Sequence, residues 1–172
     1  MIVLLNGPFG VGKTTTARLL VRWVPDAMLY DPETIGCMLR RIARPVHPVQ
    51  DYQDARLWRR LVPALAWPLV HIARRTLVIP MTVWRRAYWD ELLARLRRAD
   101  ADVRAFRLTA SEETLRARII QDGNDAGARG WRLAHMHNVR TALSDAAFGT
   151  EIATDGRTPI EVAHHITHAL QT

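Results

Sequence analysis

A glycine-rich segment near the amino terminus constrains this chain more than any other feature. Residues 6–20 read NGPFGVGKTTTARLL and contain the pattern glycine, four residues, glycine, lysine, threonine, from Gly7 to Thr14. Four apolar residues, Ile2 to Leu5, come directly before the segment, and a helical pattern follows it. In this setting the glycines let backbone N–H groups surround an anion, and the start of the helix faces the same anion. The segment therefore predicts a phosphate-binding loop.

Residues of this loop have predicted roles in holding ATP. Lys13, the only lysine among 24 basic residues, can reach the β- and γ-phosphates and is a candidate for catalysis. The Thr14 hydroxyl can ligate Mg²⁺, so we expect ATP and Mg²⁺ as cofactors. The residues predicted to contact the nucleotide are Gly7, Phe9, Gly10, Val11, Gly12, Lys13, Thr14 and Thr15.

The rest of the chain alternates between strand and helix patterns. Short apolar runs at residues 1–6, 27–31, 76–81, 102–108 and 150–155 predict five strands, with helical patterns between them. This alternation is typical of an α/β fold with a parallel sheet, whose ligands bind at the carboxyl ends of the strands. Residues 51–75 are mostly helical, and Pro63 and Pro68 predict a kink or two short helices there.

Length and composition favour one domain, residues 1–172, that acts on a small anionic ligand. The net charge is +7, but the arginines are spread over several helical patterns, so we expect no nucleic-acid partner. No secretory signal precedes the first strand, and the longest mostly apolar run, residues 61–73, is too short to span a bilayer. The single cysteine, Cys37, suits a reducing compartment, and we expect a cytoplasmic protein.

Acidic residues after the predicted strands indicate the class of phosphate-loop protein. Many motor and switch proteins hold Mg²⁺ with an aspartate at the end of a later strand, but the third predicted strand ends VIPMT, residues 78–82, without an acid. The acid at a strand end near the loop is instead Asp31. Its carboxylate can accept a proton from a substrate hydroxyl, bind Mg²⁺ through water, or cap the following helix. Glu33 suits the first turn of that helix and is also a candidate for substrate contact.

Arginines lie in and around a glycine-containing segment, residues 121–130, that reads QDGNDAGARG. We expect residues 119–132 to form a lid, with Arg129 on its loop. A closing lid can bring arginines to the charge that develops on a transferring phosphate and can expel water. Helical geometry turns Arg116 and Arg118 to different sides, so only one of them is expected to face the site.

Six stretches together resemble the tunicamycin-resistance protein family, a group within the phosphate-loop kinases. They read NGPFGVGKT, YDPETIGCMLR, DYQDARLWR, LVIPMT, LTASEETLRAR and IATDGRTPIEVAHHI, and they cover nearly the whole chain. The resemblance implies a kinase-like sheet with strand order 2-3-1-4-5 and resistance to tunicamycin, a uridine-containing nucleoside antibiotic with an acyl tail. It also implies that Asp31 is the base, that Arg118 is the inward arginine, and that Asp155, Gly156 and Arg157 lie beside adenine.

The same resemblance places the acceptor in a helical segment, residues 32–75. Trp58 and Trp67 could line an apolar groove there, although large apolar side chains more often pack in a core; Thr82, after the third strand, is a further candidate. Arginines flank the segment and could contact anionic lipid headgroups, so peripheral membrane contact is a weaker hypothesis. These arginines are Arg59, Arg60, Arg74 and Arg75.

The sequence therefore predicts an ATP-dependent kinase that phosphorylates tunicamycin or a related nucleoside. Two alternatives stay open at this point, a non-catalytic module that sequesters the drug with help from ATP, and a general metabolite kinase. The patterns do not indicate an oligomeric state, the hydroxyl that is phosphorylated, or the native substrate.

Overall fold

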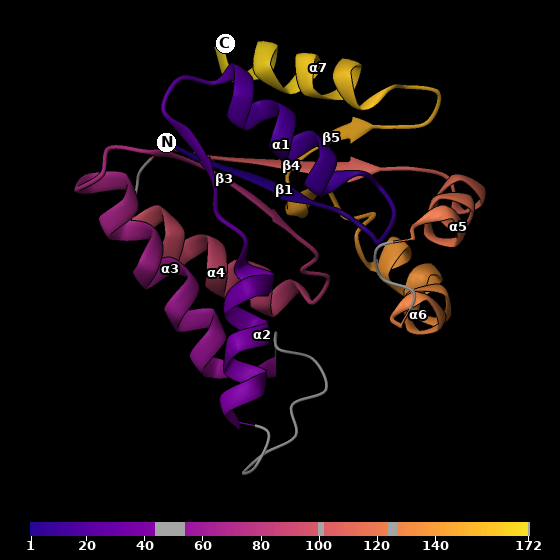
Figure 1. Ribbon diagram of the computed structural model, residues 1–172, viewed down its shortest axis with the longest axis horizontal. Coiled ribbons are helices and arrows are strands. Elements are labelled where there is room, and N and C mark those ends of the chain that lie inside the picture. Colours follow the sequence, from indigo (N-terminus) through magenta and orange to yellow (C-terminus); the bar gives the residue numbers. More distant parts are fainter. Residues whose placement is uncertain (44–53, 100–101, 124–126, 172) are drawn as a thin grey trace.

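The computed structural model describes residues 1–43, 54–99, 102–123 and 127–171, which form a five-stranded parallel sheet flanked by helices (Figure 1). The strands are β1 (Ile2–Asn6), β2 (Ala27–Leu29), β3 (Thr76–Met81), β4 (Val103–Thr109) and β5 (Thr150–Ala153). Their order in the sheet is β2-β3-β1-β4-β5, which confirms the predicted fold class and strand order. Residues 44–53 of the predicted acceptor segment and 124–126 of the predicted lid lie outside the described residues.

The helices cover both faces of the sheet and its carboxyl end. They are α1 (Lys13–Trp23), α2 (Pro32–Ala43), α3 (Arg56–His71), α4 (Arg86–Ala99), α5 (Glu112–Gln121), α6 (Arg129–Ala142), the short 3₁₀ helix η2 (Ala146–Phe148), and α7 (Pro159–Gln171). Helices α1 and α7 pack together on one face, and α3 and α4 pack together on the other, with α5 and α6 beside the loop that follows β1 (Figure 1). Among the helices of the described residues, none is long and apolar enough to cross a membrane.

The central strand β1 shows why the sequence forms a sheet with two covered faces. All five of its residues are buried. Val3 and Leu5 belong to the core beneath α1 and α7, whereas Ile2 and Leu4 belong to the core beneath α3 and α4. Because side chains alternate along a strand, a strand covered on both faces needs the continuous apolar run seen here. The position of β1 in turn fixes the start of the phosphate loop at the middle of the sheet.

Helix α3 continues through both of its prolines, so the predicted alternative of two short helices is wrong. Pro63 and Pro68 lie inside one helix, and Pro63 is buried. Each proline lacks the N–H that would bond to the carbonyl four residues earlier. Trp58, Val62 and Ala66 lie in the core on this face of the sheet, and this burial, together with the packing on α4, offsets the lost backbone bonds.

Candidate active site

The phosphate loop is anchored by the buried amide of Asn6, a residue that the sequence analysis missed. Its Nδ2 donates to the Val83 carbonyl oxygen (2.9 Å), and its Oδ1 accepts from the backbone N–H groups of Gly7 (2.9 Å) and Val83 (3.0 Å). The side chain is fully buried. It thus joins the end of β1 to the segment after β3. The available sequence signal was a polar residue ending an otherwise apolar strand.

Two glycines allow the loop its path and leave the start of α1 open to an anion. A Cβ at Gly7 would lie 2.8 Å from the Leu108 carbonyl oxygen, which is too close for any side chain. Gly12 has φ +98° and is the N-cap of α1, a conformation that glycine adopts without strain. This N-cap has no side chain to bond to the helix, and the first turn of α1 has no acidic residue. The N–H groups of that turn are therefore available to a phosphate.

Lys13 lies over the loop and is half-buried. Its Nζ donates to the carbonyl oxygens of Gly7 (2.9 Å) and Pro8 (2.8 Å). Burial lowers the pKa of Lys13 to about 8, against the opposing charge of Glu33 and with a smaller contribution from Arg132. A phosphate that replaced the two carbonyls as partner would favour the charged form of the lysine.

A cavity of about 610 Å³ opens over the loop, a size within the usual range for small-molecule sites. It is lined by Phe9, Gly10, Val11, Gly12, Lys13, Thr14, Thr15, Thr16, Arg18, Glu33, Thr82, Arg118, Asp122, Arg132, Thr154, Arg157, Pro159 and Val162. Five of these side chains are basic and two are acidic, so the lining favours a polyanion. The cavity brings together most of the residues predicted to contact nucleotide, although Gly7 is not in its lining.

Arg118 connects α5 to the segment after β5 at this cavity. Its Nη1 donates to Thr154 Oγ1 and its Nη2 to the Thr154 carbonyl oxygen, each at 3.1 Å. Arg157 lines the cavity as well. Arg118, predicted to be catalytic, and Arg157, predicted to contact the nucleotide, therefore lie at one site with the phosphate loop. Both roles stay predictions.

Asp155, by contrast, is directed at the start of α5. Its carboxylate accepts from Ser111 Oγ (2.9 Å) and from the Ser111 backbone N–H (2.8 Å). Hydrogen bonds from Thr114 and Ser111 lower the pKa of Asp155. Neither Asp155 nor Gly156 lines the cavity. The predicted contact of these two residues with adenine stays a prediction, and the role that the structure shows for Asp155 is to hold α5.

The two acids near the start of α2 have different positions. Asp31 Oδ1 accepts from the backbone N–H of Glu33 (2.9 Å), so Asp31 caps α2, and it does not line the cavity. Glu33 does line it, and its charge acts on Lys13. Sequence reasoning favoured Asp31 as the base, but of these two acids it is Glu33 that lines the cavity with Lys13.

The arginine of the predicted lid is on a helix. Arg129 is the first residue of α6, so its predicted position in a loop is wrong; the helix begins there because Arg132 N–H bonds to the Ala128 carbonyl oxygen (2.9 Å). Arg129 Nη2 donates to the Asp122 carbonyl oxygen (3.1 Å), and Arg132 forms an ion pair with the Asp122 carboxylate (3.2 Å). Of these two arginines it is Arg132 that lines the cavity.

The remaining substrate candidates, in and after the predicted acceptor segment, do not lie together. Trp58 is buried and its Nε1 donates to the Pro32 carbonyl oxygen (2.8 Å), so it is a core residue; Trp67 is 49% exposed, and neither lines the cavity. Thr82 does, and its Oγ1 donates to the Gly7 carbonyl oxygen (3.0 Å). Arg59 is buried and pairs with Glu91 (2.7 Å), so it is not part of a basic surface.

The loop, the basic cavity and the strand order define a P-loop nucleotide-binding protein with a kinase-like fold. The sequence matches the protein family described as "AAA domain" over residues 2–142, and the chain belongs to this family. No curated protein matches the sequence.

Solved structures share this fold over almost the whole chain. The tunicamycin resistance protein of Deinococcus radiodurans is 25% identical, with a TM-score of 0.81 over 99% of this chain and 95% of that one. This similarity confirms the resemblance inferred from the motifs. A gluconokinase from Sinorhizobium meliloti (14%, TM-score 0.68, 98% and 90% covered) and the Mycobacterium tuberculosis APS kinase in complex with AMPPNP and APS (17%, 0.70, 99% and 97%) share the fold.

Proposed function

We propose that this protein is an ATP-dependent kinase that transfers the γ-phosphate to a hydroxyl of tunicamycin or a related nucleoside. The observation that supports it most is a basic cavity that joins a phosphate loop to a carboxylate, Glu33, beside the loop lysine, Lys13. The similarity to the D. radiodurans tunicamycin resistance protein supports the choice of acceptor.

In this proposal the phosphates of ATP lie against the first turn of α1. The N–H groups of the turn donate to phosphate oxygens, and Lys13 exchanges its two carbonyl partners for the β- and γ-phosphates. Arg118 and Arg132, which line the same cavity from α5 and α6, stabilise the charge on the transferring group. To contact a phosphate, Arg132 would have to break its ion pair with Asp122 or share it.

The donors at the cavity fit a magnesium ion that is held largely by the nucleotide. Mg²⁺ uses few protein ligands at such sites and keeps phosphate oxygens and waters. The Thr14 hydroxyl and the Glu33 carboxylate both line the cavity, and Asp31 could act through water. When bound, Mg²⁺ would neutralise charge on the β- and γ-phosphates. Among the described residues, no group of three or more His, Cys, Asp or Glu is arranged to hold a metal ion alone.

The transfer itself forms one bond and breaks another. The acceptor oxygen bonds to the γ-phosphorus, the bond from that phosphorus to the bridging oxygen breaks, and ADP leaves with the electron pair. The hydroxyl proton passes to a carboxylate. Asp31 and Glu33 are the two candidates. The helix cap uses Oδ1 of Asp31, which leaves Oδ2 to accept the proton. Glu33 lines the cavity.

Mass spectrometry of tunicamycin incubated with protein, Mg²⁺ and ATP tests this function. We expect a product heavier by one phosphate. Asp31→Asn and Glu33→Gln are matched variants, since each removes a charge with little change of shape. Turnover should fall at least about 100-fold in the variant that lacks the base, which is the range expected for general-base catalysis. Tight drug binding without any modified product would refute the kinase and favour the sequestering module.

A further inference from the structure

Phe9 of the phosphate loop contacts a pair of rings on α6, Trp131 and His135, that have no part in the roles described above. The Phe9 and Trp131 ring centroids are 5.3 Å apart with an interplanar angle of 66°, and Trp131 stacks on His135 at 4.4 Å and 25°. We refer to Phe9, Trp131 and His135 as the aromatic shelf. Trp131 is 47% exposed, so much of this large apolar ring faces solvent.

The shelf adjoins the cavity on the side of α6. Phe9 belongs to the phosphate loop and lines the cavity. Trp131 does not itself line the cavity but contacts Phe9 from the first turn of α6. The shelf therefore connects the loop that would hold the phosphates to the helix that carries a cavity arginine.

The Trp131 ring packs against two other rings. Phe9 contacts it in an edge-to-face arrangement, which is a favourable geometry for aromatic pairs. His135 is one helical turn further on, and its Nδ1 bonds to the Trp131 carbonyl oxygen at 2.8 Å. A partly exposed ring that packs against its neighbours loses little side-chain entropy when it binds a ligand.

We propose that the aromatic shelf binds a flat, unsaturated ring of the acceptor, as a nucleobase would provide, by stacking. This inference rests on the proposed function, because it takes the acceptor to lie beside the phosphate loop. The cavity itself is lined with basic groups suited to phosphates, whereas the shelf offers a large, partly exposed aromatic ring. Stacking on such a face is tolerant of the identity of the base but requires a planar ring. A sugar acid, which is neither planar nor aromatic, lacks this interaction.

Equilibrium binding of uridine and of tunicamycin, each in the presence of a non-hydrolysable ATP analogue, tests the proposal. Trp131→Ala should weaken both by about 5- to 150-fold, the range for loss of one stacked base. Trp131→Phe should retain affinity within about threefold because a planar ring remains. Affinity for the ATP analogue alone should stay within about twofold of the unaltered protein, since the loop and its arginines are intact.

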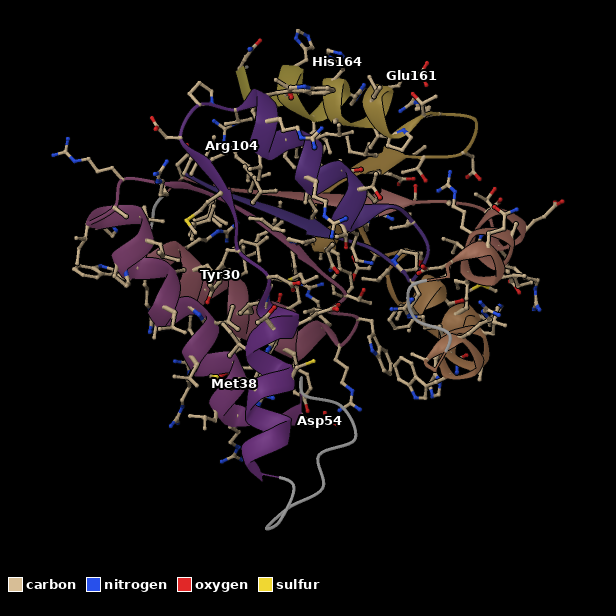
Figure 2. The ribbon with its side chains drawn as sticks, viewed as in Figure 1. Tyr30, Met38, Asp54, Arg104, Glu161 and His164 are labelled. Carbon is tan, nitrogen blue, oxygen red and sulfur yellow. The ribbon has the colours of Figure 1, made fainter. Side chains whose placement is uncertain are left out.

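A second stacked pair in the chain provides matched controls. Trp23 and His164 stack at 4.4 Å and 29°, which is close to the geometry of Trp131 and His135. They lie on α1 and α7, and Figure 2 shows His164 on α7, well away from α6. His164→Ala should leave uridine affinity unchanged, and His135→Ala should lower it.

The outcomes separate this proposal from the proposed function. Uridine affinity that is unchanged in Trp131→Ala, or undetectable in the unaltered protein, would overturn the shelf as a base site. An equal loss of ATP-analogue affinity in Trp131→Ala would overturn it too, because the ring would then support the loop or the adenine. If tunicamycin is never phosphorylated but its binding depends on Trp131, the kinase fails and the shelf stands. If tunicamycin is phosphorylated and its KM is unchanged in Trp131→Ala, the shelf proposal fails and the kinase proposal stands.

Discussion

Replacement of Asn6 by alanine should destabilise the protein and disorganise the phosphate loop. The Asn6 side chain makes three hydrogen bonds in a fully buried position, one to Gly7 and two to Val83. A buried hydrogen bond contributes about 1 kcal/mol net, and a buried partner left unpaired costs about 1–3 kcal/mol. Asn6→Ala should therefore lower the free energy of unfolding by about 3 kcal/mol or more. For a chain of this size the corresponding fall in Tm is about 6–12 °C.

Thermal unfolding and ATP titration of Asn6→Ala and Thr82→Val measure this effect with a matched control. Thr82→Val keeps the side-chain shape and removes the hydroxyl that bonds to the Gly7 carbonyl oxygen, so its expected cost is about 1 kcal/mol. Asn6→Ala should also weaken ATP binding more than Thr82→Val, because Gly7 is the first residue of the loop. A loss below about 1 kcal/mol, or one no larger than that of Thr82→Val, would refute the role given to Asn6.

Three further outcomes concern charged groups at the site. Affinity for ATP should fall as pH rises through about 8. The reason is that burial lowers the pKa of Lys13 in the ATP-free protein to about 8, whereas a bound phosphate favours the charged form of the lysine. Calorimetry should show that ATP binding takes up a proton above that pH, and Lys13→Arg should abolish the uptake. Asp155→Asn should lower Tm by a few degrees at neutral pH. Since hydrogen bonds lower the pKa of Asp155, its contribution is present above about pH 4 and lost on further acidification, so the two proteins should converge there. Arg118→Lys should weaken ATP binding about tenfold in titrations, because lysine cannot contact both Thr154 oxygens as arginine does. Unchanged ATP affinity would contradict the role of Arg118.

Local patterns in the sequence were enough to predict the sheet and the phosphate loop. Glycines at fixed spacing after an apolar run specify the turn by themselves, and strand–helix alternation restricts the topology. Lys13 and Thr14 could be placed because their positions follow from this short segment alone.

The direction of side chains beyond the loop could not be predicted in the same way. Asp31 and Asp155 both follow strands, as ligand-binding acids do, but the structure turns both toward helix starts. The partner of Asp155 is Ser111, which is 44 residues away in the sequence. The contact of Phe9 with Trp131 likewise depends on how α6 packs beside the loop. Such pairings arise from tertiary packing, which a single sequence does not display.

The fate of the γ-phosphate tests the central claim most directly. Protein in excess over γ-³²P-labelled ATP, with Mg²⁺ and tunicamycin, should move the label to the drug in step with the appearance of ADP, and Lys13→Ala should abolish the transfer. Label released as inorganic phosphate at a rate that does not depend on the drug would contradict transfer to this acceptor. Label that stays in ATP while the drug is bound would contradict a kinase altogether.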